Sequence, residues 1–384
     1  MSLEIDSTNR QAFQFNGNAK EYFGIWIVNL GLTIVTLGIY SAWAKVRNNQ
    51  YFYRNTKVAE STFDYTADPR KILKGRAIAV VMLIGYQLCA YFSPNISIYV
   101  LVALLLLVPL IYQSSIAFRM RYSQWRNINF RFRRNTLKMY ALFSPILIYL
   151  LVVLGGPLLF GVSPEEIAAS EESGEVSEEF SNYLIYSGVV VGLGGLFFPF
   201  WQSLYYNFVG SRTSLGSSSF SIALKARSFY GIYLATAGFG MLWGIATVVL
   251  SGYFFRMDPE AEDLSLSSFM LIYFLLIIFY LFAYAFIKTA LTNLIYSAIR
   301  LEGVEFTSTL KFWRVAWLYV SNTFAILLTV GMAIPWAKIR LARYRAENMH
   351  VISSGDTNIK SMFEDEVDAS ADAMSDLFDF DIGL

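Results

Sequence analysis

The residues of this chain most suited to binding chemistry are cations clustered beside aromatic rings. One short motif occurs twice, as Trp43-Ala-Lys45-Val-Arg47 and as Trp336-Ala-Lys338-Ile-Arg340. A third basic set is Arg131, Arg133 and Arg134, within a segment (residues 119–138) that has seven cations and no acid. Guanidinium groups bind phosphate bidentately, and basic clusters at a membrane surface attract anionic headgroups. These three sets are therefore candidate contacts for anionic lipid or another polyanion, with simple anchoring of helix ends at the interface as the alternative.

A second group of polar residues lies inside strongly apolar stretches. These positions are Lys288, Asn29, Asn322, Asn207 and Asn293. A polar side chain within a membrane is costly unless it is paired or serves a function. Lys288 is close enough to the end of its stretch to extend its ammonium group to the interface, and the asparagines can link helices by hydrogen bonds. The functional alternatives are anion binding or ion conduction for Lys288 and substrate contacts for the asparagines.

The sequence lacks the residue combinations that catalysis and metal binding require. The single cysteine, Cys89, and the single histidine, His350, exclude an internal disulfide, a cysteine metal cluster and a histidine-rich site. No nucleophile–base pair or phosphate-binding loop is visible, and no carboxylate lies in the core of an apolar stretch. We therefore expect no enzyme activity, no cofactor and no carboxylate-coupled transport. The net charge of +1 gives no indication of nucleic-acid binding.

The elements that position these residues must lie in a membrane. The chain of 384 residues is 55% hydrophobic and 15% charged, whereas soluble proteins have about 25% charged residues. About 20 apolar residues cross the hydrocarbon as a helix. Eight stretches approach or exceed that length, at residues 22–43, 76–93, 96–118, 139–161, 183–209, 228–255, 268–296 and 313–337. Because lipid offers the backbone no hydrogen-bond partner, we predict helices there and reject a membrane β-barrel.

Charge between the stretches alternates in sign and predicts their orientation. Residues 44–75 and 119–138 are basic, whereas residues 163–182 contain seven glutamates and no base, and residues 256–267 contain four acids against one arginine. Basic segments beside membrane helices stay in the cytoplasm. Six full spans between residues 76 and 296 satisfy every assignment.

The first and last apolar stretches do not fit this alternation, because full crossings would put the polar N-terminal segment and the basic residues 338–345 outside. Both stretches contain polar or helix-weakening residues such as Gly38 and Pro335. We predict broken helices that re-enter on the cytoplasmic side, with ordinary spans and outside termini as the alternative.

The same two regions are internal copies of each other. Residues 22–58 match residues 315–351 at a constant offset of 293, which aligns Asn29 with Asn322 and Trp43 with Trp336. We therefore predict a membrane domain with internal repeats at residues 22–352, between a polar segment (1–21) and an acidic disordered tail (353–384).

Five short segments begin with phenylalanine, and three of them have the pattern aromatic-x-aromatic. They are Phe13-Gln-Phe15, Phe63-Asp-Tyr65, Phe130-Arg-Phe132, Phe220-Ser-Ile222 and Phe306-Thr-Ser308. A period of two favours short strands, entered through turns at Asn55-Thr56, Arg212-Thr213 and Glu302-Gly303. The segments form either a sheet-like cytoplasmic collar or an aromatic interfacial belt. The expected fold is an all-α polytopic membrane protein, with six to eight membrane helices in a repeated-module bundle and short β-like aromatic segments at the cytoplasmic interface.

The first repeat copy carries a recognisable signature. Its parts are Trp26-Ile-Val-Asn29, Thr36-Leu-Gly-Ile-Tyr-Ser-Ala-Trp-Ala-Lys45-Val-Arg47 and Tyr51-Phe-Tyr-Arg-Asn-Thr56. They resemble the opening signature of the YjgN family of bacterial inner-membrane proteins, and the resemblance extends from about Phe13 to Tyr344. That family commonly has proline where this chain has Ala42, although the C-terminal copy retains Pro335. The resemblance implies a multi-pass inner-membrane location and a domain of unknown function, with no catalytic residues to carry over.

Two classes of function fit these features. A transporter, channel or lipid-handling protein is expected to have a solvated or lipid-filled central cavity lined by asparagine and tyrosine. A non-transporting scaffold or sensor with a basic cytoplasmic face is expected to have a dry helix core. The expected partners are membrane lipids, anionic ones because of the basic loops, and the acidic tail either is solvated or docks on those loops or on a protein partner.

Overall fold

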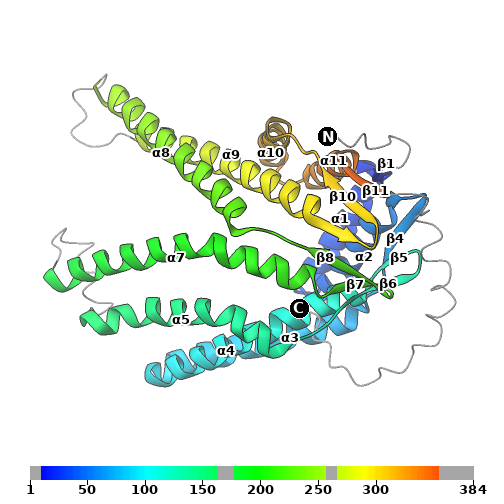
Figure 1. The fold of residues 1–384 in the computed structure, drawn as a ribbon. Coiled ribbons are helices and arrows are strands. Elements are labelled where there is room, and N and C mark those ends of the chain that lie inside the picture. Colours follow the sequence, from blue (N-terminus) through cyan, green and yellow to red (C-terminus); the bar gives the residue numbers. More distant parts are fainter. Residues whose placement is uncertain (1–9, 163–176, 257–265, 354–384) are drawn as a thin grey trace.

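The computed structural model describes residues 10–162, 177–256 and 266–353. Within these ranges the chain forms ten helices and eleven strands. The strands gather at one end of the molecule, and the long helices extend away from them on one side (Figure 1). A mostly helical, polytopic architecture is therefore confirmed. The all-α class is wrong, because the short aromatic segments belong to one continuous sheet.

The helices include six that are long and apolar enough to cross a membrane, namely α3, α4, α5, α7, α8 and α9. The described helices are α1 (Ala19–Val35), α2 (Ser41–Arg54), α3 (Pro69–Phe92), α4 (Pro94–Arg121), α5 (Thr136–Phe160), α7 (Glu178–Gly210), α8 (Ala226–Arg256), α9 (Leu266–Ala298), α10 (Phe312–Leu328) and α11 (Ile334–Glu347). Each packs against the next along the chain, and α11 packs against α1. The described helices thus close into a ring, and its six candidate spans agree with the six crossings predicted between residues 76 and 296.

The strands form a second ring at the end of the helix ring. They are β1 (Arg10–Ala12), β2 (Gln14–Phe15), β3 (Thr56–Val58), β4 (Ser61–Tyr65), β5 (Ser123–Trp125), β6 (Ile128–Phe132), β7 (Thr213–Leu215), β8 (Ser218–Ile222), β9 (Ile299–Leu301), β10 (Val304–Ser308) and β11 (Met349–Ser353). Their order in the sheet is β1-β11-β10-β9-β8-β7-β6-β5-β4-β3-β2. The two end strands, β1 and β2, are separated in the chain by Phe13 alone. The sheet therefore curves into a nearly closed ring, which we call the collar.

The collar is built from repeated two-stranded hairpins. Four of them have a three-residue strand, a two-residue turn and a five-residue strand, as in β3–β4 and β5–β6. Both turn residues have positive φ at Ala59-Glu60 and at Arg126-Asn127, the geometry whose twist matches that of the flanking strands. The fifth unit has no such turn, because β11 pairs with β1 from the other end of the chain. We call each of these five units, together with the helices joined to it, a module.

Local side chains fix where the helices leave the collar. Asn18, Asp68 and Asn135 each lie three residues beyond the end of β2, β4 and β6, and each side chain accepts a hydrogen bond from the first turn of the following helix. Such N-caps satisfy backbone donors that the helix leaves unpaired. The repeated cap gives the helices of three modules the same starting point.

The terminal helix pairs, α1–α2 and α10–α11, are short and return to the collar. Leu37 and Gly38 in one, and Val330 and Gly331 in the other, adopt positive φ and reverse the chain. The hydroxyls of Thr36 and its copy make matching hydrogen bonds in the two turns. α1 follows β2 and α2 precedes β3, so the pair begins and ends at the same sheet. Both pairs agree with the predicted re-entrant helices, and neither is among the six helices long and apolar enough to cross a membrane.

Candidate functional site

A ring of phenylalanines occupies the interior of the collar. Each of the five modules contributes one residue: the central residue of β4, β6, β8 and β10, and the residue between β1 and β2. These residues are Phe63, Phe130, Phe220, Phe306 and Phe13. Ring centroids are 6.3 Å apart for Phe13 and Phe63 and 6.2 Å apart for Phe130 and Phe220. The five rings pack against a buried cluster that includes Trp125, Ile128, Leu215, Leu301 and Val351. The alternating pattern found in the sequence therefore directs these aromatic rings inward, into a shared core.

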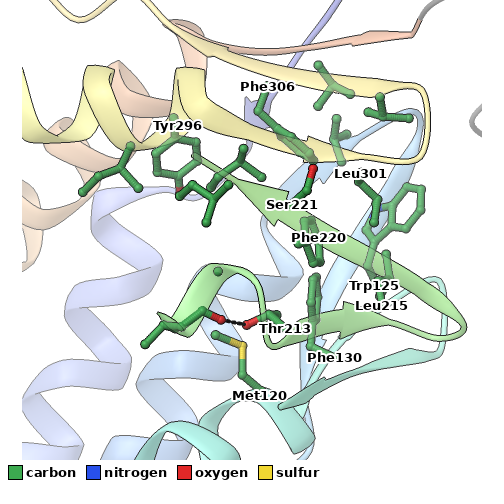
Figure 2. A pocket seen from close by; sticks show the side chains of 18 of the residues that line it. Met120, Trp125, Phe130, Thr213, Leu215, Phe220, Ser221, Tyr296, Leu301 and Phe306 are labelled. Carbon is green, nitrogen blue, oxygen red and sulfur yellow. Dashed lines mark hydrogen bonds between the residues drawn. The ribbon is translucent and has the colours of Figure 1, made fainter. Parts of the chain in front are cut away.

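An apolar cavity of about 390 Å³ lies between this core and the helix ends. Strands from all five modules line it, and Met120, Tyr206 and Tyr296 border it from α4, α7 and α9 (Figure 2). The Thr213 hydroxyl, a polar group in the lining, donates to the Val209 carbonyl oxygen at 2.8 Å. The volume is within the range of small-molecule sites. A lining of this kind suits a hydrocarbon group and excludes hydrated ions.

Asn207 and Asn293 brace the helix ends against the collar. Asn207 donates to the Leu224 carbonyl oxygen and accepts from the Leu224 amide, both at 2.8 Å. Asn293 makes the same pair of bonds with Leu310, at 2.9 and 3.1 Å. All four bonds link a helix to the linker that follows a strand. The side-chain amides of Asn207 and Asn293 are thus engaged within the protein, as expected if these residues are structural links.

Asn29 and Asn322 lie inside the two short helix pairs. Asn322 accepts a hydrogen bond from Arg340 at 3.2 Å and donates to the Ala337 carbonyl oxygen at 3.4 Å. Asn29 donates instead to Asn48 at 3.3 Å. Equivalent residues of the two repeat copies therefore have different partners.

The two cationic motifs, at residues 43–47 and 336–340, lie on α2 and α11. The Arg47 guanidinium donates to the Tyr40 hydroxyl at 3.1 Å, and the Arg340 guanidinium lies 5.0 Å from the ring of Trp336. Lys45 is half-buried and Lys338 is exposed. Burial and the positive charges of Arg76 and Arg119 lower the pKa of Lys45. The copy on α2 thus lies among cations of neighbouring helices.

The basic set of residues 131–134 lies on the collar and not on these helices. Arg131 faces outward, because Phe130 and Phe132 on either side of it are directed into the core. Arg133 follows β6 and is exposed. Arg134 is half-buried and interacts with another residue of the protein. Lys288 on α9 is exposed, with its ammonium group 5.5 Å from the ring of Tyr284. The structure therefore divides the predicted cations between the outer collar surface and the helix ring.

The lining residues contributed by the helices were not singled out from the sequence. Met120, Tyr206 and Tyr296 lie in apolar helices where nothing local distinguishes them from residues that face lipid. Among the described residues, no group of three or more His, Cys, Asp or Glu side chains could hold a metal ion. The acidic tail, predicted either to be solvated or to dock on the basic loops or on a protein partner, lies, after Ser353, outside the described residues.

Comparison with known proteins assigns the chain to a family. A family model described as "Bacterial protein of unknown function (DUF898)" matches residues 10–377. The chain is 25% identical to the inner membrane protein YjgN of Salmonella typhimurium, over 92% of this chain and 90% of that protein. It is 25% identical to the protein of the same name from Escherichia coli K12, over 90% of this chain and 89% of that protein. No solved structure matches.

These relatives confirm the resemblance found in the sequence, and together with six membrane-capable helices they identify a multi-pass protein of the bacterial inner membrane. The match to the family model covers nearly the whole chain, including the helix ring and the collar. The chain belongs to the DUF898 family of bacterial proteins of unknown function.

Proposed function

We propose that this protein handles lipid, taking apolar chains into the space that its helix ring and collar enclose, which we call the lumen. The observation that carries the proposal is an open apolar stripe on the inner face of α7. Leu184, Val191 and Phe198 follow one another at intervals of seven residues, and each is between 43% and 62% exposed. Seven residues are close to two helical turns, so the three side chains share a face.

This stripe continues to the cavity. Gln202 follows Phe198 by one turn, and Tyr206 and Val209, further along the same face, line the cavity in the collar. A second exposed stripe lies on the opposite side of α7 and includes Ile185, Val189, Leu193 and Leu196. The outer stripe suffices for contact with the bilayer. An apolar inner stripe that is open as well requires a second apolar partner inside the ring, and acyl chains have that chemistry.

In this proposal, lipid enters between α7 and α8. Near the collar the two helices are joined, by a hydrogen bond from the Tyr230 hydroxyl to the Leu196 carbonyl oxygen and another from Tyr233 to Gln202. Beyond these contacts the helices diverge (Figure 1). Apolar side chains of the diverging part of α8, among them Met241, Ile245 and Val248, are exposed. The divergence supports lateral exchange with the bilayer, without passage through water.

Charge supports a cytoplasmic collar and anionic lipid. The basic loops adjoin the collar end of the molecule, and basic segments beside membrane helices stay inside the cell. Arg131 and Arg133 on the outer collar surface are then at the level of the anionic cytoplasmic leaflet. The apolar interior of the collar favours lipid over ions. The chain's role in this proposal is to bind and pass lipid and not to convert it.

Spin labelling tests the proposal. In a Cys89→Ala background, nitroxides are placed at Leu184 and Val191 on the inner stripe and at Ile185 and Val189 on the outer stripe as matched controls. Collisions with molecular oxygen report lipid, and collisions with a water-soluble nickel chelate report water. We expect all four labels, in liposomes, to be accessible to oxygen and protected from the chelate. Inner labels accessible to the chelate would indicate an aqueous channel, and inner labels protected from both reagents would indicate the dry core of a scaffold; either result overturns the proposal.

A further inference from the structure

The five modules place a polar residue at one shared position of the helix ring. It lies eleven residues before the first residue of β3, β5, β7, β9 and β11. The five residues are Lys45, Tyr112, Gln202, Lys288 and Lys338. Lysine occupies three of the five copies of this position, although the helices that carry it range from strongly apolar (α9) to polar (α2 and α11). The recurrence indicates a shared role, because charged residues within a ring of membrane helices are retained for function.

The contacts of these residues indicate that the position faces the lumen. Gln202 is one turn from Tyr206, which lines the cavity, and Lys288 is two turns from Ile295, which lines it too. The Gln202 side-chain oxygen accepts a hydrogen bond from the Tyr233 hydroxyl at 2.9 Å. The Tyr112 hydroxyl donates to the Tyr205 hydroxyl at 3.2 Å. Lys288 thus shares the inner face with neutral groups that already have partners, and their equivalent position assigns Lys45 and Lys338 to the same face.

Further cations surround this level of the lumen. Arg119 of α4 lies near Lys45, and Arg76 donates to the Ser41 hydroxyl beside it. Arg345, at the position of Arg119 in the last module, lies near Tyr296 at the cavity. Within the part of the chain that the structure describes, Lys45, Lys288 and Lys338 form no ion pair with a carboxylate. The positive charges of Lys45, Arg76 and Arg119 repel one another, so a bound anion would stabilise this group.

The depth of the position fits a headgroup. α7 and α9 each have 33 residues, which corresponds to roughly 50 Å, against a hydrocarbon thickness of roughly 30 Å. Their outer ends adjoin the acidic loops, and about 20 residues cross the hydrocarbon. Gln202 and Lys288 then lie at the collar-side boundary of the bilayer. The apolar inner stripe of α7 runs from this level toward the membrane centre, where acyl chains belong.

We propose that Lys45, Lys288 and Lys338 bind the phosphate group of an anionic phospholipid inside the helix ring. The assignment rests on the proposed function and specifies its ligand. The acyl chains lie along the inner stripe of α7, and the polar end of the lipid is directed toward the collar. The neutral members, Tyr112 and Gln202, offer hydrogen-bonding groups at the same level.

The test compares two triple variants of the full chain in nanodiscs of phosphatidylethanolamine with phosphatidylglycerol. Lys45→Gln/Lys288→Gln/Lys338→Gln removes the lumenal cations, and Arg131→Gln/Arg133→Gln/Arg134→Gln removes the same charge from the collar surface. After extraction, native mass spectrometry counts the phosphatidylglycerol that remains bound. We expect the lumenal variant to lose retention by at least roughly tenfold, since each basic residue contributes about a factor of five. That loss should persist at high salt because an enclosed site is poorly screened, whereas any loss in the surface variant should be salt-dependent.

A Lys→Arg triple variant at the same positions keeps the charge and should retain the lipid, which separates loss of binding from loss of folding. Equal phosphatidylglycerol retention in wild type and the lumenal variant would overturn the assignment. So would a wild-type protein that retains zwitterionic phosphatidylethanolamine as well as it retains phosphatidylglycerol. Titration of delipidated protein with inorganic phosphate separates the two sources of this group. Binding of phosphate without retention of phosphatidylglycerol would overturn the lipid as ligand. If the inner nitroxides report lipid while the lumenal variant keeps its phosphatidylglycerol, the proposed function survives and this site does not.

Discussion

The long membrane helices and the short helices of the terminal pairs differ in length, but both lead into the collar in the same way. α9 has 33 residues and α11 has 14, yet each leads into a collar strand and each carries a lysine eleven residues before it. The brace that Asn293 makes with Leu310 also has a counterpart, because Arg343 of α11 donates to the Gly17 carbonyl oxygen at 3.2 Å. The part that recurs in both kinds of pair is the last few helical turns with the strands that follow.

The difference in helix length separates two roles of a module, which are crossing the membrane and building the collar. Crossing the membrane depends on helix length, and a module without that length still contributes to the collar. The short pairs reverse at Gly38 and Gly331, where positive φ is easily adopted. The collar is therefore the element that all five modules share, and the long pairs add the apolar walls of the lumen. The predictions below test this division, beginning with the largest expected effect.

Loss of the strand that closes the collar should have the largest effect. Deletion of residues 349–384 removes β11, which pairs with both β10 and β1, and removes the buried Val351 from the core. We expect the apparent unfolding temperature in detergent to fall by about 10 °C or more, as for loss of a core residue together with its strand pairings. Deletion of residues 354–384 is the matched control and should leave the unfolding temperature unchanged. An equal drop for both deletions would show that the collar does not depend on β11.

Truncation inside the collar should destabilise more than truncation on a membrane helix. Trp125 is 4% exposed within the core of the collar, whereas Leu193 is 60% exposed on the outer stripe of α7. Trp125→Ala is expected to reduce the free energy of unfolding by about 3–5 kcal/mol, and Leu193→Ala by less than about 0.5 kcal/mol. Reversible unfolding in mixed micelles measures both. Similar losses would mean that the helix ring, not the collar, limits stability.

The braces of long and short pairs should differ in strength. Asn293→Ala leaves the amide and carbonyl groups of Leu310 without their partner, at an expected loss of about 1–3 kcal/mol. Arg343→Ala removes a single bond to a carbonyl oxygen, and its expected loss is about 0.5–1.5 kcal/mol. Hydrogen exchange of the Leu310 amide reports the first change locally. A larger loss for Arg343→Ala would reverse the order of the two braces.

The smallest effect should be a pH dependence where the two chain ends meet. Arg10 Nη2 lies 3.1 Å from His350 Nδ1 across the β1–β11 pairing. Burial and the charge of Arg10 lower the pKa of His350. The pKa of His350 in the folded chain is therefore below its value in the unfolded chain, about 6.5. The stability that neutral His350 gives to the β1–β11 pairing is present above that pH and is lost as the pH falls below it.

Exchange of the β1 amides, corrected for its intrinsic pH dependence, should therefore become faster between about pH 7.5 and pH 5.5. His350→Gln keeps a neutral polar side chain and should remove the change. An unaltered pH profile in that variant would show that another group is responsible.

The collar was only partly predictable. Four of the five alternating segments correctly marked the five-residue strands β4, β6, β8 and β10, whereas in Phe13-Gln-Phe15 the strand β2 begins only after Phe13. Glu302-Gly303 is the predicted turn. The turns predicted at Asn55-Thr56 and Arg212-Thr213 are correct for Asn55 and Arg212 and wrong for Thr56 and Thr213, which begin β3 and β7. A strand of three residues carries too little alternation to be recognised. Cavity residues such as Met120 and Tyr296 were missed because an apolar residue facing a lumen has the same local pattern as one facing lipid.

The sequence by itself determined the class of protein, the six apolar spans and the terminal repeat, while the cytoplasmic side of the basic loops stays a prediction. Each of these depends on local composition or on matching segments, which hydropathy and charge report directly. Only the tertiary structure decided that β11 joins β1, that five phenylalanines share one core and that an apolar cavity lies beside that core. Contacts between residues hundreds of positions apart depend on how the modules close around a common axis, and no local period encodes that closure.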